Sequence, residues 1–107
     1  MTNLIQVHTT ASSEEEAGRI ADALLAQELA ACVQISGPIK SRYRWQGQLE
    51  QATEWMCVAK TRADLFDAVE SAIRDVHSYD QPEILATAIV AGAQGYLDWV
   101  NEVTAGG

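Results

Sequence analysis

The sequence feature that most constrains the fold is the segment from Ala30 to Thr61, which carries strand-forming residues on both sides of a short polar turn. Side chains alternate along an extended chain, so the first half of this segment has two different faces. One face carries Ile39, Ser41, Tyr43 and Trp45, and the other carries Lys40, Arg42 and Arg44. After a turn at residues 46–48, the stretch at 54–61 alternates in the same way. This pattern predicts a long β-hairpin that extends beyond the body of the protein.

The rest of the chain reads as alternating strands and helices. Ser13 and Glu16 form a capping box that predicts a helix start, and Thr61 with Asp64 predicts the cap of a second helix. Pro38 cannot donate to a strand ladder, so it marks a bend. The expected elements are a strand at 3–9, a helix at 13–29, a strand at 30–35 that bends into the hairpin, a helix ending at 77, a strand at 84–90 and a terminal helix at 95–103.

This order predicts a single α+β domain over residues 1–107. Two strand-helix-strand units with right-handed crossovers give a ferredoxin-like βαββαβ sandwich, with both main helices on one face of an antiparallel sheet and a short C-terminal helix. One sheet face then has no helical cover. The chain has more large apolar side chains than one helix layer needs, so we expect this open face to meet other subunits. Those side chains are Ile35, Tyr43, Trp45, Trp55 and Trp99.

Charge and cysteine content narrow the class of partner and the compartment. Fifteen acidic and seven basic residues give a net charge of −8, which repels phosphate backbones and makes nucleic acid a poor partner. The N-terminus lacks a basic segment followed by an apolar one, and no apolar run is long enough to span a membrane. Cys32 and Cys57 lie in apolar strand patterns, which favours buried free thiols. We therefore expect a soluble cytoplasmic protein.

Several motifs, taken in order and spacing, resemble the CutA family of divalent-cation tolerance proteins over nearly the whole chain. They are Leu29 to Val33 (LAACV), Ser41, Tyr43-Arg44-Trp45 with Gly47, Glu54, Lys60-Thr61, His77 with Tyr79, Pro82-Glu83-Ile84, and Tyr96 with Trp99. The resemblance implies a tight homotrimer of ferredoxin-like protomers, similar in architecture to PII signalling proteins. It also implies a link to divalent metals, copper above all, and a cytoplasmic role without an enzymatic reaction.

The two histidines are the first candidate metal ligands. In the expected topology the first and last strands are antiparallel neighbours, so His8 and His77 should approach each other at one edge of the sheet. Two imidazoles, with Cys32 as a third ligand, would prefer Cu²⁺ among divalent first-row ions. The same residues have simpler interpretations, because a loop histidine is often only hydrogen-bonded and Cys32 lies among apolar residues.

Polar and aromatic residues of the hairpin and of the loop before the last strand form a second candidate site. They are Tyr43, Trp45, Glu54, Lys60, Tyr79 and Glu83. If subunits close around them, they line a cleft in which Lys60 could hold a small anion. Packing between subunits and an interface ion pair are the alternatives. The basic strand face of Lys40, Arg42 and Arg44 similarly fits either a solvated face or anion capture.

Two functions follow from these observations. The first is a cytoplasmic homotrimer that binds copper or another divalent cation and contributes to cation tolerance. The alternative is a PII-like signalling trimer that binds a small anionic ligand between subunits. Catalysis has little support, because the chain has neither a glycine-rich phosphate loop nor a GxSxG elbow.

Overall fold

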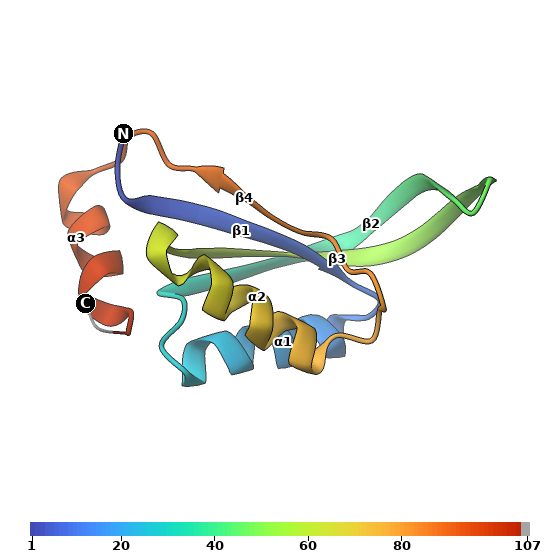
Figure 1. The fold of residues 1–107 in the computed structure, drawn as a ribbon, viewed down its shortest axis with the longest axis horizontal. Coiled ribbons are helices and arrows are strands. Elements are labelled where there is room, and N and C mark those ends of the chain that lie inside the picture. The colour runs from blue at the N-terminus through green and yellow to red at the C-terminus, as the bar shows by residue number, and fades with distance from the viewer. Residues whose placement is uncertain (106–107) are drawn as a thin grey trace.

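The computed structural model describes residues 1–105 as a four-stranded antiparallel sheet in the order β2-β3-β1-β4, with three α-helices (Figure 1). This architecture confirms the predicted α+β sandwich, including the antiparallel pairing of β1 with β4. Helices α1 and α2 lie side by side against one face of the sheet, and α3 lies at the end opposite the hairpin tip. The elements are β1 (Leu4–Ala11), α1 (Glu14–Ala26), β2 (Cys32–Trp45), β3 (Gln48–Arg62), a 3₁₀ turn (Ala63–Leu65), α2 (Phe66–Val76), β4 (Ile84–Ala88) and α3 (Gln94–Val103).

The start of α1 follows the predicted capping signal. The Ser13 side chain accepts a hydrogen bond from the Glu16 backbone N–H at 3.1 Å, which satisfies one of the free donors of the first turn. In a standard capping box the Glu16 side chain would accept from the backbone N–H of Ser13, but here it bonds to the preceding residue. Its carboxylate accepts hydrogen bonds from the backbone N–H and the hydroxyl of Ser12 at 2.8 and 2.9 Å. Glu16 is fully buried, so this helix start belongs to the core.

Strands β2 and β3 pair along the length of the hairpin, which extends away from the sandwich as predicted (Figure 1). Its register shifts between Ser36 and Ile39, around Gly37 and Pro38, so the predicted bend is a β-bulge within one strand. The ring of Trp55 packs against Gly37 so closely that a Cβ there would lie 2.5 Å from Trp55 Cδ1. At the tip, Gly47 has φ of +79°, a conformation that glycine adopts without strain.

The second helix starts later than the sequence pattern predicted. Thr61 is not a helix cap, because β3 continues through Arg62, which pairs with Leu4 of β1. The Thr61 hydroxyl instead donates a hydrogen bond of 2.6 Å to the carbonyl oxygen of Leu29. Long-range pairing with β1 therefore overrides the local capping signal. A 3₁₀ turn follows, and α2 begins at Phe66.

The core lies between the sheet and the two main helices. Alternate residues of β1 and β3 point into it and meet the apolar stripes of α1 and α2. Its fully buried members include Val7, Ala11, Ala17, Ile20, Leu24, Cys57, Ala59, Val69 and Ile73. None of the helices within residues 1–105 is both long and apolar enough to cross a membrane.

The opposite sheet face is only partly covered. His8, Val58 and Thr87 alternate with core residues and so point to this open face. Leu85 lies on the same face and is 51% exposed. Tyr96 and Trp99 of α3 also keep 40% or more of their surface exposed, although their rings pack against each other. The single chain therefore presents an apolar surface that its helices do not bury.

Candidate functional site

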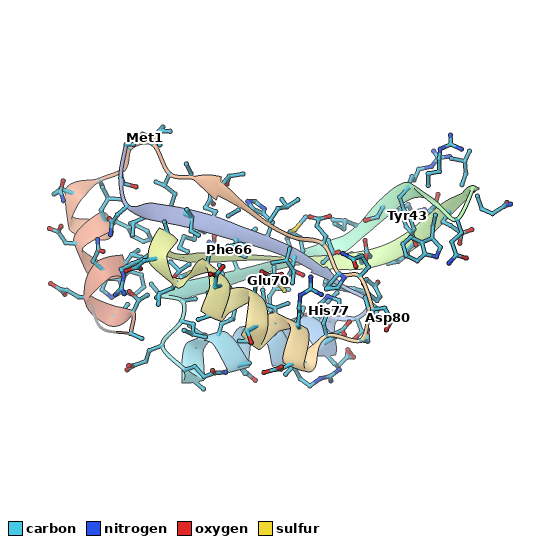
Figure 2. The ribbon with its side chains drawn as sticks, viewed as in Figure 1. Met1, Tyr43, Phe66, Glu70, His77 and Asp80 are labelled. Atoms are coloured by element: carbon cyan, nitrogen blue, oxygen red, sulfur yellow. The ribbon has the colours of Figure 1, made fainter. Side chains whose placement is uncertain are left out.

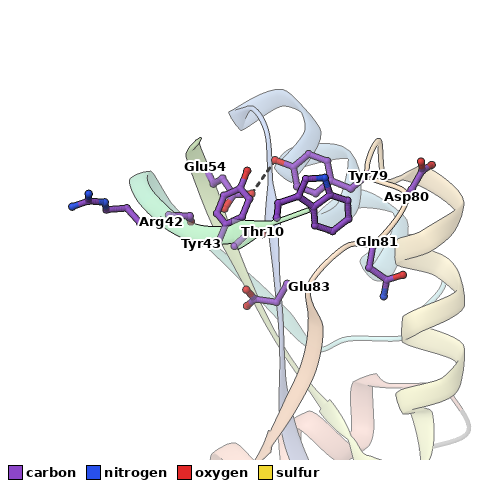
Figure 3. Close-up of a pocket in the computed structure, with 10 residues that line it drawn as sticks. Thr10, Arg42, Tyr43, Glu54, Tyr79, Asp80, Gln81 and Glu83 are labelled. Atoms are coloured by element: carbon purple, nitrogen blue, oxygen red, sulfur yellow. Dashed lines mark hydrogen bonds between the residues drawn. The ribbon is translucent and has the colours of Figure 1, made fainter. Parts of the chain in front are cut away.

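A pocket of about 610 Å³ lies where the hairpin leaves the body of the protein. One wall comes from β2 and β3, and the other from the segment between α2 and β4, with Thr10 of β1 between them (Figure 3). We call this the hairpin pocket. Its lining residues are Thr10, Ser41, Arg42, Tyr43, Trp45, Glu54, Tyr79, Asp80, Gln81 and Glu83.

A hydrogen bond between the two walls fixes the geometry of the pocket. The Tyr79 hydroxyl donates to Glu54 Oε2 at 2.9 Å, as the dashed line in Figure 3 marks. Glu54 is only 7% exposed. Burial of the phenol, together with its hydrogen bond to the Glu54 carboxylate, raises the pKa of Tyr79. Tyr79 therefore stays protonated at neutral pH and holds the carboxylate in place.

Buried polar groups hold the loop that carries Tyr79. His77 Nε2 donates to the Thr10 carbonyl oxygen at 2.7 Å, while His77 Nδ1 accepts from the Tyr79 backbone N–H at 3.1 Å. The rings of His77 and Tyr79 also pack with centroids 4.8 Å apart. Figure 2 shows His77 at the end of α2, close to Asp80 of the same loop. His77 therefore connects the loop to β1 and positions one wall of the pocket.

Glu16 holds the same loop from the side of α1. Its Oε2 accepts a 2.7 Å hydrogen bond from the Ser78 backbone N–H. Burial of the carboxyl raises its pKa, but hydrogen bonds from Ser12 and Ser78 outweigh this and lower the pKa to about 2. The nearby negative charge has a second effect. Burial and the charge of Glu16 raise the pKa of the Cys57 thiol to about 11, so Cys57 is a buried thiol and not a thiolate.

The structure brings together five of the six residues predicted for the second site. Tyr43, Trp45, Glu54, Tyr79 and Glu83 all line the hairpin pocket. Lys60 does not, although it lies on the same face of β3 as Glu54. Six residues of strand separate the two positions, a distance of about 20 Å. The Lys60 ammonium instead donates to the side chain of Gln34.

The charges of the pocket differ from those expected for an anion site. Three carboxylates line it, from Glu54, Asp80 and Glu83, against one guanidinium from Arg42. Figure 3 shows the Arg42 side chain extending away from the other labelled residues. Without Lys60, the pocket has no second cation. Its electrostatics therefore favour a positively charged ligand over the small anion that the sequence suggested.

The three predicted metal ligands lie apart. His8 points to the open sheet face and forms a 3.3 Å hydrogen bond with Thr87 Oγ1. His77 follows α2, in the helix layer on the other face, and both of its ring nitrogens are engaged. Cys32 pairs with Lys60 in the β2–β3 ladder, far along the sheet from the hairpin pocket. His8 and His77 therefore have different hydrogen-bond partners, and residues 1–105 contain no group of three metal-ligating side chains.

Sequence reasoning missed Ser12 and Ser78, which support the pocket, and it gave Glu16 only a role in helix capping. The hydrogen bond from Ser78 to Glu16 joins positions 62 residues apart, which no local motif reveals. Three other lining residues could have been predicted from the sequence, because each lies within two residues of a predicted site residue. They are Thr10, Asp80 and Gln81. Arg42 was assigned to the basic strand face, and it lies at the rim of the pocket.

The fold and this site define a class of protein, an α+β ferredoxin-like sandwich with a ligand-sized pocket at the base of a long hairpin. The model of the CutA1 divalent ion tolerance protein family matches residues 5–103. The chain therefore belongs to the CutA1 family, as its motifs predicted.

Curated relatives agree with this assignment. The chain is 46% identical over 96 residues to the divalent-cation tolerance protein CutA of Archaeoglobus fulgidus, covering 90% of this chain and 93% of the relative. It is 41% identical over 95 residues to that of Thermus thermophilus, covering 89% and 92%. The chloroplastic CutA 1 of Oryza sativa is 36% identical over 100 residues, which are 94% of this chain and 56% of the relative. The chain thus spans about half the length of such plant relatives.

Solved structures share the whole fold. CutA1 from Oryza sativa superposes with a TM-score of 0.95 at 34% identity, covering 99% of this chain and 97% of that one. The Thermus thermophilus protein gives 0.92 at 40% identity, covering 94% and 98%. The Archaeoglobus fulgidus structure, described as a periplasmic divalent cation tolerance protein, gives 0.91 at 44% identity, covering 94% and 97%.

Proposed function

We propose that this member of the divalent cation tolerance family acts as a homotrimer that binds divalent metal ions, Cu²⁺ above all. The observation that carries the proposal is the open sheet face, which is accessible in the single chain and includes the imidazole of His8. Leu85, Tyr96 and Trp99 on or beside that face are each 40% or more exposed, and self-association would bury them. The family names of its relatives supply the link to divalent cations.

In this proposal, His8 is the protein's own metal ligand and the trimer supplies the remaining ones. His77 and Cys32 are less suitable. Both ring nitrogens of His77 already have partners, and Cys32 lies beside the Tyr96 hydroxyl. A single protomer offers no three-ligand cluster within residues 1–105, so a metal bound through His8 would be shared between protomers. An imidazole ligand favours Cu²⁺ over the other divalent first-row ions.

We further propose that the protein works by binding, without catalysing a reaction, and that it does so in the cytoplasm. Cys57 and His77 have the side chains most suited to catalysis, but both have structural roles. Cys57 is a buried thiol, and the His77 ring holds the loop after α2 through its hydrogen bond to Thr10. Cys32 and Cys57 are both free thiols, which suits a reducing compartment. Cell fractionation tests the compartment, and recovery in a periplasmic fraction would contradict it.

Two measurements test the central proposal. Sedimentation equilibrium of the full chain should give three times the protomer mass, and a monomer at micromolar concentration would contradict the trimer. Calorimetric titration with Cu²⁺ should show binding that His8→Ala weakens. Gln6→Ala is the matched control, because Gln6 lies two residues earlier on the same face of β1. Equal Cu²⁺ affinity in the two variants would remove His8 from the site.

A further inference from the structure

Glu16 and His77 meet inside the chain with two hydrogen-bond acceptors close together. Glu16 Oε2 lies 3.8 Å from His77 Nδ1, and the two side chains are 2% and 0% exposed. His77 Nδ1 carries no proton, because it accepts the Tyr79 backbone N–H while Nε2 donates to the Thr10 carbonyl oxygen. The pair is buried within the single chain, so its contacts do not depend on what covers the open sheet face.

Two consecutive backbone N–H groups of the loop between α2 and β4 bind these acceptors. The Ser78 N–H donates to Glu16 Oε2 at 2.7 Å, and the Tyr79 N–H donates to His77 Nδ1 at 3.1 Å. The second of these bonds requires a ring nitrogen without a proton, because both nitrogens of a protonated imidazole are donors. Protonation of His77 Nδ1 and the hydrogen bond from Tyr79 therefore exclude each other.

The surroundings of the ring supply a counter-charge for a protonated imidazole. Burial alone would raise the pKa of Glu16, but the hydrogen bonds that its carboxylate accepts lower the pKa to about 2, so it stays ionised in mild acid. Burial raises the pKa values of the Cys57 thiol on β3 and the Tyr79 phenol, so both stay neutral. Glu54 lies beyond the Tyr79 hydroxyl, and Asp80 is exposed in the same loop. The buried carboxylate on α1 is therefore the partner for a positive charge on the ring.

We infer that Glu16 and His77 form a pH-sensitive switch for the loop between α2 and β4. At neutral pH, His77 Nδ1 holds the Tyr79 backbone N–H. When Nδ1 takes up one proton from solvent, that bond breaks, and the new N–H donates to Glu16 Oε2 as an ion pair. Ser78 stays bound to Glu16, while the backbone of Tyr79 is released. Because the Tyr79 hydroxyl also donates to Glu54, the proton changes one wall of the hairpin pocket.

An NMR titration of the full chain from neutral to acid pH, in metal-free buffer, tests the switch. The ring nitrogen shifts of His77 report its protonation, while the amide shift and hydrogen exchange of Tyr79 report the loop. We expect the two transitions to share one midpoint, with the amides of α1 and α2 still protected. His8→Gln removes the only other imidazole of the chain, on the opposite sheet face, and should leave the Tyr79 transition in place.

Glu16→Gln tests the ion pair. The amide oxygen can still accept a backbone N–H but carries no charge, so the proton affinity of the His77 ring should fall by about tenfold or more. The matched control is Glu15→Gln, an exposed carboxylate in the same helix turn, which should change that affinity by about twofold or less. If Glu16→Gln does not fold, the comparison of ring and amide in the wild type still decides.

Three results would overturn the inference. The first is a His77 ring that takes up its proton while the Tyr79 amide keeps its shift and its protection. The second is a ring that stays neutral until the whole chain unfolds. The third is an equal effect of Glu16→Gln and Glu15→Gln on the proton affinity of the ring. None of these results depends on Cu²⁺ binding or on the trimer, so the switch and the proposed function can fail separately.

Discussion

The carboxylate of Glu16 accepts a hydrogen bond from the backbone N–H of Ser78 at 2.7 Å, across a sequence separation of 62 residues. This contact joins the first turn of α1 to the segment that follows α2. The same carboxylate also accepts hydrogen bonds from the backbone N–H and the hydroxyl of Ser12, the residue before the cap of α1. A single buried group thus connects a helix start, a second helix end and the loop that forms one wall of the hairpin pocket.

The first prediction concerns the pH dependence of stability. The pKa of Glu16 is about 2 in the folded protein, against an ordinary value of 4.5, so the folded state favours the ionised form. The stabilisation is complete above pH 4.5 and is lost as the pH falls towards 2, and its size is about 3 kcal/mol. Glu16→Gln should therefore lower the free energy of unfolding at pH 7, with the difference from wild type shrinking at low pH. Urea unfolding at several pH values measures this.

Glu15→Gln is the control for that experiment. Glu15 is the neighbouring carboxylate in the first turn of α1, and it is exposed. Its substitution should change the free energy of unfolding by about 0.5 kcal/mol or less. If Glu16→Gln and wild type show parallel pH profiles, the carboxylate does not contribute as its contacts indicate.

Local signals in the sequence were enough to predict the helix start at Ser13, the long hairpin and the order of the elements. Each of these features depends on residues that are close together in the chain. The apolar strand pattern also predicted the burial of Cys57, which lies in the core, whereas Cys32, expected to be buried as well, is only half-buried. The start of α2 could not be found in this way, since pairing of Arg62 with Leu4 extends β3 past Thr61.

The candidate sites were less predictable, and distance within the fold is the reason. His8 and His77 were expected at one sheet edge, but strand alternation turns His8 to the open face while His77 follows a helix on the other face. Lys60 and Glu54 share a face, yet six residues of extended chain keep them apart. The alternation of side chains predicts which face of the sheet a residue occupies. A binding site also depends on how far apart its residues lie along the strands and on contacts from segments remote in the sequence.

The second prediction separates a structural from a metal-binding role of His77. Its ring donates through Nε2 to Thr10 and accepts through Nδ1 from Tyr79, so His77→Ala should lose both bonds and leave a cavity. We expect a loss of about 2–4 kcal/mol in the free energy of unfolding, with Cu²⁺ affinity per folded molecule unchanged. Nitrogen chemical shifts of the wild-type ring should show a proton on Nε2. A proton on Nδ1 instead, or loss of Cu²⁺ binding in a folded variant, would contradict this role.

The third prediction uses the same substitution at two buried threonines. The Thr9 hydroxyl is the one buried side-chain polar atom within residues 1–105 that lacks a hydrogen-bond partner, whereas the Thr61 hydroxyl donates to Leu29 at 2.6 Å. Thr9→Val removes an unsatisfied group and should raise the free energy of unfolding by about 1 kcal/mol. Thr61→Val leaves the Leu29 carbonyl without this donor and should lower it by about 1–3 kcal/mol. Chemical denaturation measures both, and changes of the same sign in the two variants would contradict the hydrogen-bond assignment.

The last prediction compares two glycines. Gly37 lies at the bulge in β2, where a Cβ would lie 2.5 Å from Trp55 Cδ1, so Gly37→Ala requires the Trp55 ring or the strand to move. We expect Gly37→Ala to lower the free energy of unfolding by about 1–3 kcal/mol through overpacking. Gly18 lies within α1, where an added Cβ would meet no side chain within 4 Å, so Gly18→Ala should stabilise the protein by about 0.5–1 kcal/mol. Thermal and urea unfolding of both variants give the measurement. If Gly37→Ala is as stable as wild type, the Trp55 ring is not held at the bulge, and the base of the hairpin is less rigid than its contacts indicate.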